Sequence, residues 1–279
     1  MNGTTVSTRQ FSSVGPLRLY VENGRGSVEV TARETTEATV DLTGSGADDV
    51  RVELDGEDLV VIAPQQRSGF FEGDRRLDIV VVVPLRSELT AKLGSAELVC
   101  HGELGAASIR SGSGDVVLEH LAGAALLETG SGDVRIEHAQ EPVRIKSGSG
   151  DVSVSQCGSE VSISTGSGDV ELGDCHGSVS VKTGSGDLSV AHSRAGVGLS
   201  TGSGTLVIDR ATSGRVHLKG ASGDLRVGIP AGVPVWTDVS TISGHVHSTL
   251  EGAGQPEDGA DFVEVLAKTV SGDIDLHQL

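Results

Sequence analysis

The hexapeptide TGSGDV occurs at residues 129–134 and again at 165–170. Its aspartates belong to a series with a constant spacing of 18 residues, which Thr205 continues. The variants on this spacing are SGSGDV at 111–116 and 147–152, TGSGDL at 183–188 and TGSGTL at 201–206. A constant internal period of this size is typical of a stacked-repeat protein.

Each period contains two short segments in which apolar and polar residues alternate. After Asp151, for example, come Val152 and Val154, and nine residues later come Val161 and Ile163. Alternation with a period of two is typical of a β-strand with one buried face, and neither segment has helical spacing. Each period is therefore expected to form strand, corner, strand, corner, with the glycine-rich motif at one corner.

The constant length of the period indicates how the strands pair. In a β-solenoid each strand lies parallel to its copy one coil away, about 4.8 Å distant, so a change in length would break the ladder. The sequence thus predicts an all-β fold, a parallel β-solenoid with two strands in each 18-residue coil. Glycine is expected at the corner because it adopts positive φ freely, and serine and aspartate because they bond nearby backbone. The corner glycines are Gly112, Gly114, Gly130, Gly132, Gly148, Gly150, Gly166, Gly168, Gly184 and Gly186.

The regular repeat occupies only the middle of the chain. We expect residues 1–92 to form an irregular N-terminal β region continuous with the solenoid, 93–229 the regular repeat, and 230–279 stretched coils and a cap. The acidic segment 250–262 is predicted to be a surface loop. The strand-like residues 268–279 are predicted to form the last rung, open to end-to-end assembly. The aromatic residues all lie outside the regular repeat and are expected to cap its two ends: Phe11, Tyr20, Phe70, Phe71, Trp236 and Phe262.

Composition narrows the classes of partner and location. The chain has 279 residues and a formal net charge of -18, which repels nucleic acid and anionic membranes. The longest aliphatic run, at 79–83, ends at Pro84 and is too short to span a membrane. We therefore expect no nucleic-acid partner and no membrane insertion. The first residues lack the apolar stretch of a secretory signal, which predicts a cytoplasmic protein. The same observation is compatible with a processed form of a longer exported chain.

The chain resembles a bacterial family of β-strand repeat proteins, the "putative adhesin" family, whose domain has no assigned function. The resemblance rests on GSVEV at 26–30, LDIVVVVP at 77–84, the recurring TGSGD, TISGHV at 241–246 and TVSGDI at 269–274. It covers nearly the whole chain. It implies a β-solenoid without catalytic residues, and it implies adhesion only for surface-exposed members of the family.

Calcium binding is the leading alternative function. Glycine-rich corners with aspartate in 18-residue coils are typical of the calcium β-roll, in which GGxGxDxUx occurs twice per coil. Here the aspartate occurs once per coil and directly follows glycine. Stacked carboxylates about 5 Å apart repel by about 0.8 kcal/mol in water, a cost that cations or turn hydrogen bonds would relieve. We expect no metal, and the weak calcium candidates are Asp115, Asp133, Asp151, Asp169 and Asp187.

Histidines are the other candidate metal ligands. His120, His138 and His192 occupy one column of the repeat, and His245 and His247 point to one face of a strand. No cysteine or carboxylate lies at ligand spacing from them, so zinc is not expected.

The three cysteines do not suggest a disulfide framework. Cys157 and Cys175 are one period apart and should be neighbours on adjacent coils, close enough for a disulfide. A reducing compartment favours the thiols. Cys100 aligns with Leu118 and is expected in the core.

A polysaccharide-binding or polysaccharide-active β-helix protein is the second alternative. Such a site needs paired acids beside a groove, and no nucleophile–base pair is visible in the repeat. The outward positions are mostly short: Val117, Arg135, Ser153, Glu171 and Ser189 on one face, and Leu126, Arg144, Ser162 and Ser180 on the other. We therefore predict a non-catalytic structural or interaction scaffold without a cofactor. Its partner would be an unknown protein or another copy bound through the solenoid ends.

Overall fold

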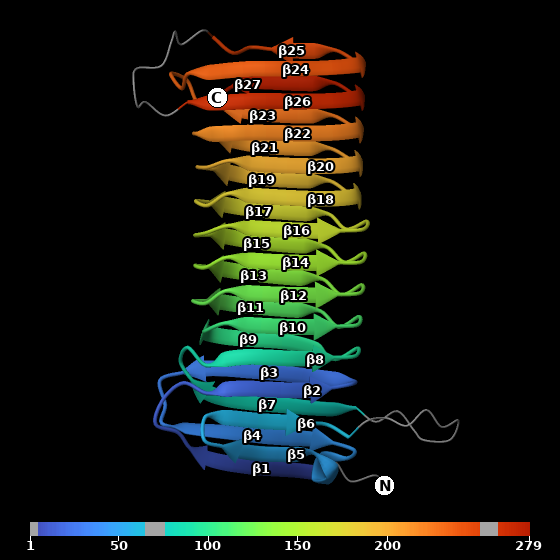
Figure 1. The fold of residues 1–279 in the computed structure, drawn as a ribbon. Helices are drawn as coiled ribbons and strands as arrows, with labels where there is room; N and C mark the ends of the chain where they lie inside the picture. The colour runs from blue at the N-terminus through green and yellow to red at the C-terminus, as the bar shows by residue number, and fades with distance from the viewer. Residues whose placement is uncertain (1–4, 65–75, 252–261) are drawn as a thin grey trace, which may run out of the picture. The chain divides into compact units, whose positions relative to one another are not determined.

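The computed structural model of the chain describes residues 5–64, 76–251 and 262–279. Two compact units divide the chain, Met1–Glu141 and Pro142–Leu279. In each unit the described strands wind between two sheets, and most neighbouring strands are parallel (Figure 1). The predicted parallel β-solenoid is confirmed.

The N-terminal unit holds thirteen strands and one short 3-10 helix among its described residues. They are β1 (Thr5–Ser12), β2 (Arg18–Asn23), β3 (Gly26–Arg33), β4 (Glu37–Gly44), η1 (Ala47–Asp49), β5 (Arg51–Asp55), β6 (Asp58–Ile62), β7 (Leu77–Pro84), β8 (Glu88–Leu93), β9 (Glu97–Leu104), β10 (Ala107–Ser111), β11 (Val116–Leu121), β12 (Ala125–Thr129) and β13 (Val134–Ala139).

The C-terminal unit holds fourteen strands among its described residues. They are β14 (Val143–Ser147), β15 (Val152–Cys157), β16 (Val161–Thr165), β17 (Val170–Cys175), β18 (Val179–Ser185), β19 (Leu188–Ser193), β20 (Val197–Ser203), β21 (Leu206–Ala211), β22 (Gly214–Ser222), β23 (Leu225–Ile229), β24 (Val235–Ser243), β25 (Val246–Ser248), β26 (Val263–Ser271) and β27 (Ile274–Gln278).

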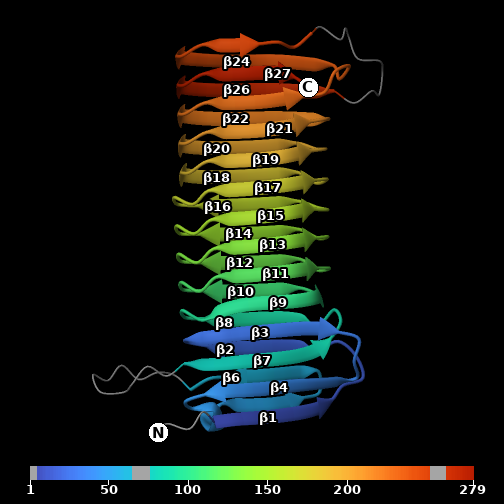
Figure 2. The ribbon, with the colours of Figure 1, turned by 180° about the vertical axis from the view of Figure 1, so that it is seen from behind.

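The 18-residue period sets the register of the regular coils. In the C-terminal unit β15, β17, β19 and β21 are parallel neighbours, and Val152 pairs with Val170, which pairs with Leu188. The opposite sheet repeats this pattern with β16, β18 and β20, where Val161 pairs with Val179 (Figure 2). Equal coil length therefore places like residues in columns on both sheets.

Each regular coil has five buried positions rather than the four that alternation shows, and in most coils all five are apolar. In one coil of the N-terminal unit these are Val116, Leu118, Leu121, Ala125 and Leu127, none more than 6% exposed. The alternation breaks after Leu118, and the third buried position comes three residues later, at Leu121. Sequence reasoning missed this column because a strict period of two skips it.

The N-terminal unit departs from simple winding. One of its sheets has the order β1-β4-β7-β3-β9-β11-β13, and the other has the order β5-β6-β2-β8-β10-β12. The coil formed by β2 and β3 thus lies between the coil of β6 and β7 and that of β8 and β9. β1 and β4, β4 and β7, and β5 and β6 are antiparallel pairs.

The C-terminal unit has a similar insertion at its end. Its sheets have the orders β15-β17-β19-β21-β23-β27-β25 and β14-β16-β18-β20-β22-β26-β24. The coil of β26 and β27 therefore lies between that of β22 and β23 and that of β24 and β25 (Figure 1). The prediction that residues 268–279 form the last rung is wrong, because the chain returns to pair on both sides of this segment.

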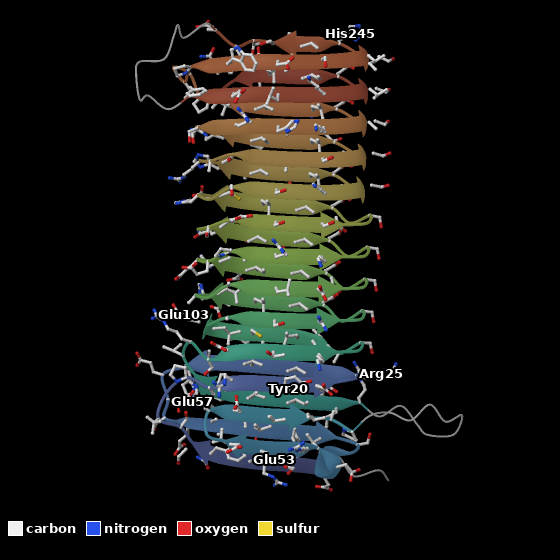
Figure 3. The ribbon with its side chains drawn as sticks, in the orientation of Figure 1. Tyr20, Arg25, Glu53, Glu57, Glu103 and His245 are labelled. Atoms are coloured by element: carbon white, nitrogen blue, oxygen red, sulfur yellow. The ribbon has the colours of Figure 1, made fainter. Side chains whose placement is uncertain are left out.

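Two of the six aromatic residues, Tyr20 and Trp236, lie on outer faces and do not form the expected caps. Tyr20 lies on the outer face of β2, as Figure 3 shows, and Trp236 on β24 is 54% exposed. Phe11 is only half-buried on the edge strand β1. Phe70 and Phe71, and most of the acidic loop predicted at 250–262, lie outside the described residues.

Candidate functional site

The repeated corner is held by hydroxyl side chains that bond its own backbone. Ser147 Oγ donates to the carbonyl oxygen of Gly150 at 3.1 Å, and the N–H of Gly150 lies 3.0 Å from that hydroxyl. Ser111 makes the equivalent bond to Gly114 at 2.7 Å in the N-terminal unit. The Ser or Thr that opens each motif is therefore a turn-forming residue.

Close approach of adjacent coils explains the corner glycines. A Cβ on Gly114 would lie 1.9 Å from the carbonyl oxygen of Ala96, and one on Gly168 would lie 2.1 Å from that of Gly150. Positive φ is found at Gly204, at 141°, but not at Gly114 or Gly168. Lack of space, rather than the expected positive φ, excludes a side chain at these two positions.

The motif aspartates form a hydrogen-bonded ladder along the corner. Asp169 Oδ1 accepts the N–H of Asp187 at 2.8 Å, and the N–H of Asp169 donates to Asp151 Oδ1 at 2.8 Å. Asp187 in turn accepts the N–H of Thr205 at 2.7 Å. In the N-terminal unit the N–H of Asp133 donates to Asp115 Oδ1 at 2.9 Å. One oxygen of each accepting carboxylate thus satisfies the backbone of the next coil.

The ladder follows the stacking order of the coils and not the chain order. Asp224 accepts the N–H of Asp273 at 2.9 Å, and Asp273 accepts the N–H of His245 at 2.8 Å. His245 therefore takes the aspartate position in the coil of β24 and β25 (Figure 3). Among the described residues, no group of three or more His, Cys, Asp or Glu side chains has an arrangement that could hold a metal ion.

The histidine column has a packing role in the N-terminal unit. The rings of His120 and His138 stack with centroids 4.5 Å apart and an interplanar angle of 32°. Glu119, on the same strand as His120, accepts the N–H of Gly102 at 2.8 Å, and this bond together with the nearby histidines lowers the pKa of its carboxyl group. The column is therefore a surface stack with neighbouring hydrogen bonds.

His192 belongs to a different cluster, centred on Asp174 in the C-terminal unit. Arg194 donates to both oxygens of Asp174, at 3.2 and 2.9 Å, while His192 and His176 lie 3.2 and 3.3 Å from the same carboxylate. The hydrogen bonds from Arg194 are the largest cause of the lowered pKa of Asp174. This single acid is thus bound by one arginine and flanked by two histidines, and the cluster contains no second carboxylate.

The cysteines are core residues. Cys157 and Cys175 are register partners on β15 and β17, and they continue the third buried column, followed by Ser193 and Ala211. All three cysteines are free and buried. The hydrogen bond with Cys175 and burial raise the pKa of Cys157, and burial raises that of Cys100, so both remain protonated and unreactive.

Insertion of the last segment creates a charged depression that the sequence did not reveal. Its volume is about 550 Å³, and it lies across β21, β23, β27 and β25. His247 pairs in register with Asp275, and His277 Nδ1 lies 4.0 Å from Asp275 Oδ2. Chain spacing separates His247 from Asp275 and His277, so only the stacking order brings them together. The remaining lining residues include Asp209, Arg226 and Asp273.

The N-terminal unit has a groove of about 630 Å³ beside its corner. Lys92 and Glu22 line it, and Lys92 Nζ lies 2.7 Å from Tyr20 Oη and 3.3 Å from Glu22 Oε1. Tyr20 also donates a hydrogen bond to Glu22. The tyrosine, lysine and glutamate satisfy one another, so this groove contains no free acid–base pair among them.

No helix in the described part of the chain has the length and apolar character needed to cross a membrane.

No curated protein matches the chain. Solved structures that match include a "putative cell adhesion protein" of Clostridium sporogenes, with 13% identity and a TM-score of 0.26, covering 99% of this chain and 100% of the other. A "putative adhesin" of Parabacteroides merdae matches with 14% identity and a TM-score of 0.36, covering 99% and 97%. A "putative lipid binding protein" of Parabacteroides distasonis matches with 13% identity and a TM-score of 0.31, covering 100% and 98%.

A family model supplies the assignment. The model of the Toastrack DUF4097 family matches residues 18–277, which include both intercalated coils and the whole regular repeat. The chain belongs to the Toastrack DUF4097 family.

Proposed function

We propose that the chain is a non-catalytic scaffold, adhesin-like in fold, that offers its sheet faces and its outermost coil to other proteins. The observation that carries this proposal is the aspartate ladder. The residues that look most like a repeated binding motif have their carboxylates committed to backbone N–H groups of the next coil, as between Asp169 and Asp187. Their repetition is explained by folding without any ligand.

The outward positions support the same conclusion. On the sheet that contains β15 and β17, the register aligns Ser153 with Glu171 and Ser189. These three side chains alternate between serine and glutamate, so this row places no two acids directly opposite each other. Hydrolysis of a glycoside requires two carboxyl groups facing one bond, about 5 to 10 Å apart. This row offers a polar contact surface rather than such a pair.

The location of the protein is part of the proposal. The three cysteines are free and buried, which suits a reducing compartment. We place the protein in the cytoplasm, and cell fractionation with an antibody to the chain tests this assignment. Recovery of the protein from the cell surface would favour adhesion instead.

The absence of catalysis is tested with a panel of bacterial and plant polysaccharides, followed by measurement of released reducing ends. We expect no release above that of heat-denatured protein. The Asp174→Asn variant is the matched control, since Asp174 has one arginine and two histidines within 3.3 Å of its carboxylate. Release that depends on one acidic residue would overturn the proposal in favour of a polysaccharide-active protein.

A further inference from the structure

The outermost coil of the C-terminal unit has an edge to which no described strand is paired. β24 pairs with β26 on one side and is the last strand of its sheet among the described residues. Val263 donates its N–H to the carbonyl of Pro234 at 2.9 Å, so the even-numbered residues at the start of β24 direct their backbone groups toward β26. Because alternate residues of a strand bond to opposite sides, the backbone groups of Val235, Thr237 and Val239 point away from β26.

This edge lacks the features that protect edge strands. Natural sheets protect their edges with charges, prolines or inward-pointing charged residues. In the N-terminal unit, Arg9 on β1 pairs with the fully buried Val40 and so points to the interior side, and β5 carries Arg51 and Glu53. β24 has one charged residue, Asp238, whose carboxylate lies 3.4 Å from Lys268 Nζ.

The exposed apolar side chains of β24 are placed for contact with a second copy. Trp236 is 54% exposed and Ile242 is 83% exposed. An antiparallel pair of two β24 strands centred on Val239 sets Trp236 of each copy directly opposite Ile242 of the other. Cross-strand pairs of an aromatic and a β-branched residue stabilise such a pair.

The same alignment suits the remaining positions. It sets Val239 opposite Val239 and Thr237 opposite Thr241, all with backbone groups that point to the free edge. Asp238 comes opposite Ser240, so no like charges face each other across the pair. An interface of this kind is two-fold symmetric and closed, which is the commonest arrangement of homo-oligomers.

We propose that β24 pairs antiparallel with β24 of a second copy, so that the protein forms a two-fold dimer through the end of its C-terminal unit. This inference rests on the proposed scaffold function and names its partner. The interface joins β24 edges and does not use residues 268–279, which are paired inside the stack on both sides.

Introduced cysteines test the register of the pair in the full-length chain. In the proposed pair the Cα atoms of the two Val239 residues are about 5.5 Å apart, within the range for a disulfide. Val239→Cys should therefore form a cross-linked species of twice the 28.5 kDa chain mass under mild oxidation. The matched control is Ser240→Cys, whose two copies lie about 7 to 8 Å apart on the outer face. The native cysteines are buried and should not contribute.

We expect Val239→Cys to cross-link at least ten times faster than Ser240→Cys. In analytical ultracentrifugation we expect the unsubstituted chain to have the mass of a dimer. Trp236→Lys should shift that mass to the monomer, while Leu126→Lys, at an exposed apolar position of β12, should not. A monomer at every concentration, equal rates for the two cysteine variants, or growth beyond the dimer would each overturn the inference. None of these outcomes bears on catalysis, so the scaffold proposal is judged separately by the polysaccharide panel.

Discussion

Substitution of Asp169 separates the hydrogen-bonding role of the corner aspartates from a role in binding cations. Asp169 accepts the N–H of Asp187 and donates its own N–H to Asp151. Asparagine at this position keeps an oxygen that can accept the same bond, whereas alanine removes the acceptor. Both substitutions remove the charge that a calcium ion would need.

The expected magnitudes follow from the coil spacing. Carboxylates about 4.8 Å apart repel by about 0.9 kcal/mol in water, and screening at physiological salt roughly halves this value. Removing the charge of Asp169 thus relieves about 1 kcal/mol from its two neighbours, Asp151 and Asp187. A neutral acceptor makes a hydrogen bond weaker by about 1 kcal/mol than a charged one, so Asp169→Asn should lie within about 0.5 kcal/mol of wild type. Asp169→Ala loses the bond entirely and should destabilise the fold by about 1 kcal/mol.

Urea unfolding of the wild type and both variants, each with calcium and with a chelator, measures these differences as shifts of the midpoint. We expect the alanine variant to fall below the asparagine variant, and the order to be the same in calcium and in chelator. Equal loss in the two variants, together with a calcium-dependent rise in wild-type stability that both abolish, would refute the ladder argument and support the β-roll.

The remaining predictions concern packing, register and charge. Gly168→Ala places a methyl group 2.1 Å from the carbonyl of Gly150 and should destabilise by about 3 kcal/mol or more in urea unfolding, whereas Gly15→Ala, with nothing within 4 Å, should be nearly neutral. One residue inserted after Val152 should reverse the faces of β15 and prevent cooperative unfolding, and one inserted near Ser159 should be tolerated; equal tolerance contradicts the solenoid register. Asp174 has a lowered pKa, so its contribution to stability is present above the unfolded carboxyl pKa and is lost as pH falls through the folded value. Thermal melts of wild type and Asp174→Asn should therefore differ above about pH 4 and converge in stronger acid, and a difference independent of pH would refute this assignment.

The regular coils could be read from the sequence because their period is a physical requirement. Val152, Val170 and Leu188 must lie one above another for the ladder to close, and their equal spacing records that requirement. The third buried column was missed because the alternation of buried and exposed residues ends after Val154, and the next buried side chain is Cys157, three residues later. The reason for glycine was also incomplete, since contact between coils at Gly114 depends on a neighbour 18 residues away that local φ preferences do not describe.

The stacking order at the ends could not be read from spacing. Strands of similar length have similar hydrogen-bonding capacity. β22 could therefore pair with β24, the next strand of its sheet along the chain, as well as with β26, which is its observed neighbour. The apolar pattern favours the observed order, because β26 buries Val263, Val265 and Ala267 completely, while one of the three corresponding positions of β24 is a threonine, Thr237. The more apolar segment takes the position with a coil on each side, and the more polar one takes the end. An intercalated coil cannot unfold by itself without breaking the hydrogen bonds to both neighbouring coils in each sheet. The inserted segments therefore stabilise the terminal coils of the two units.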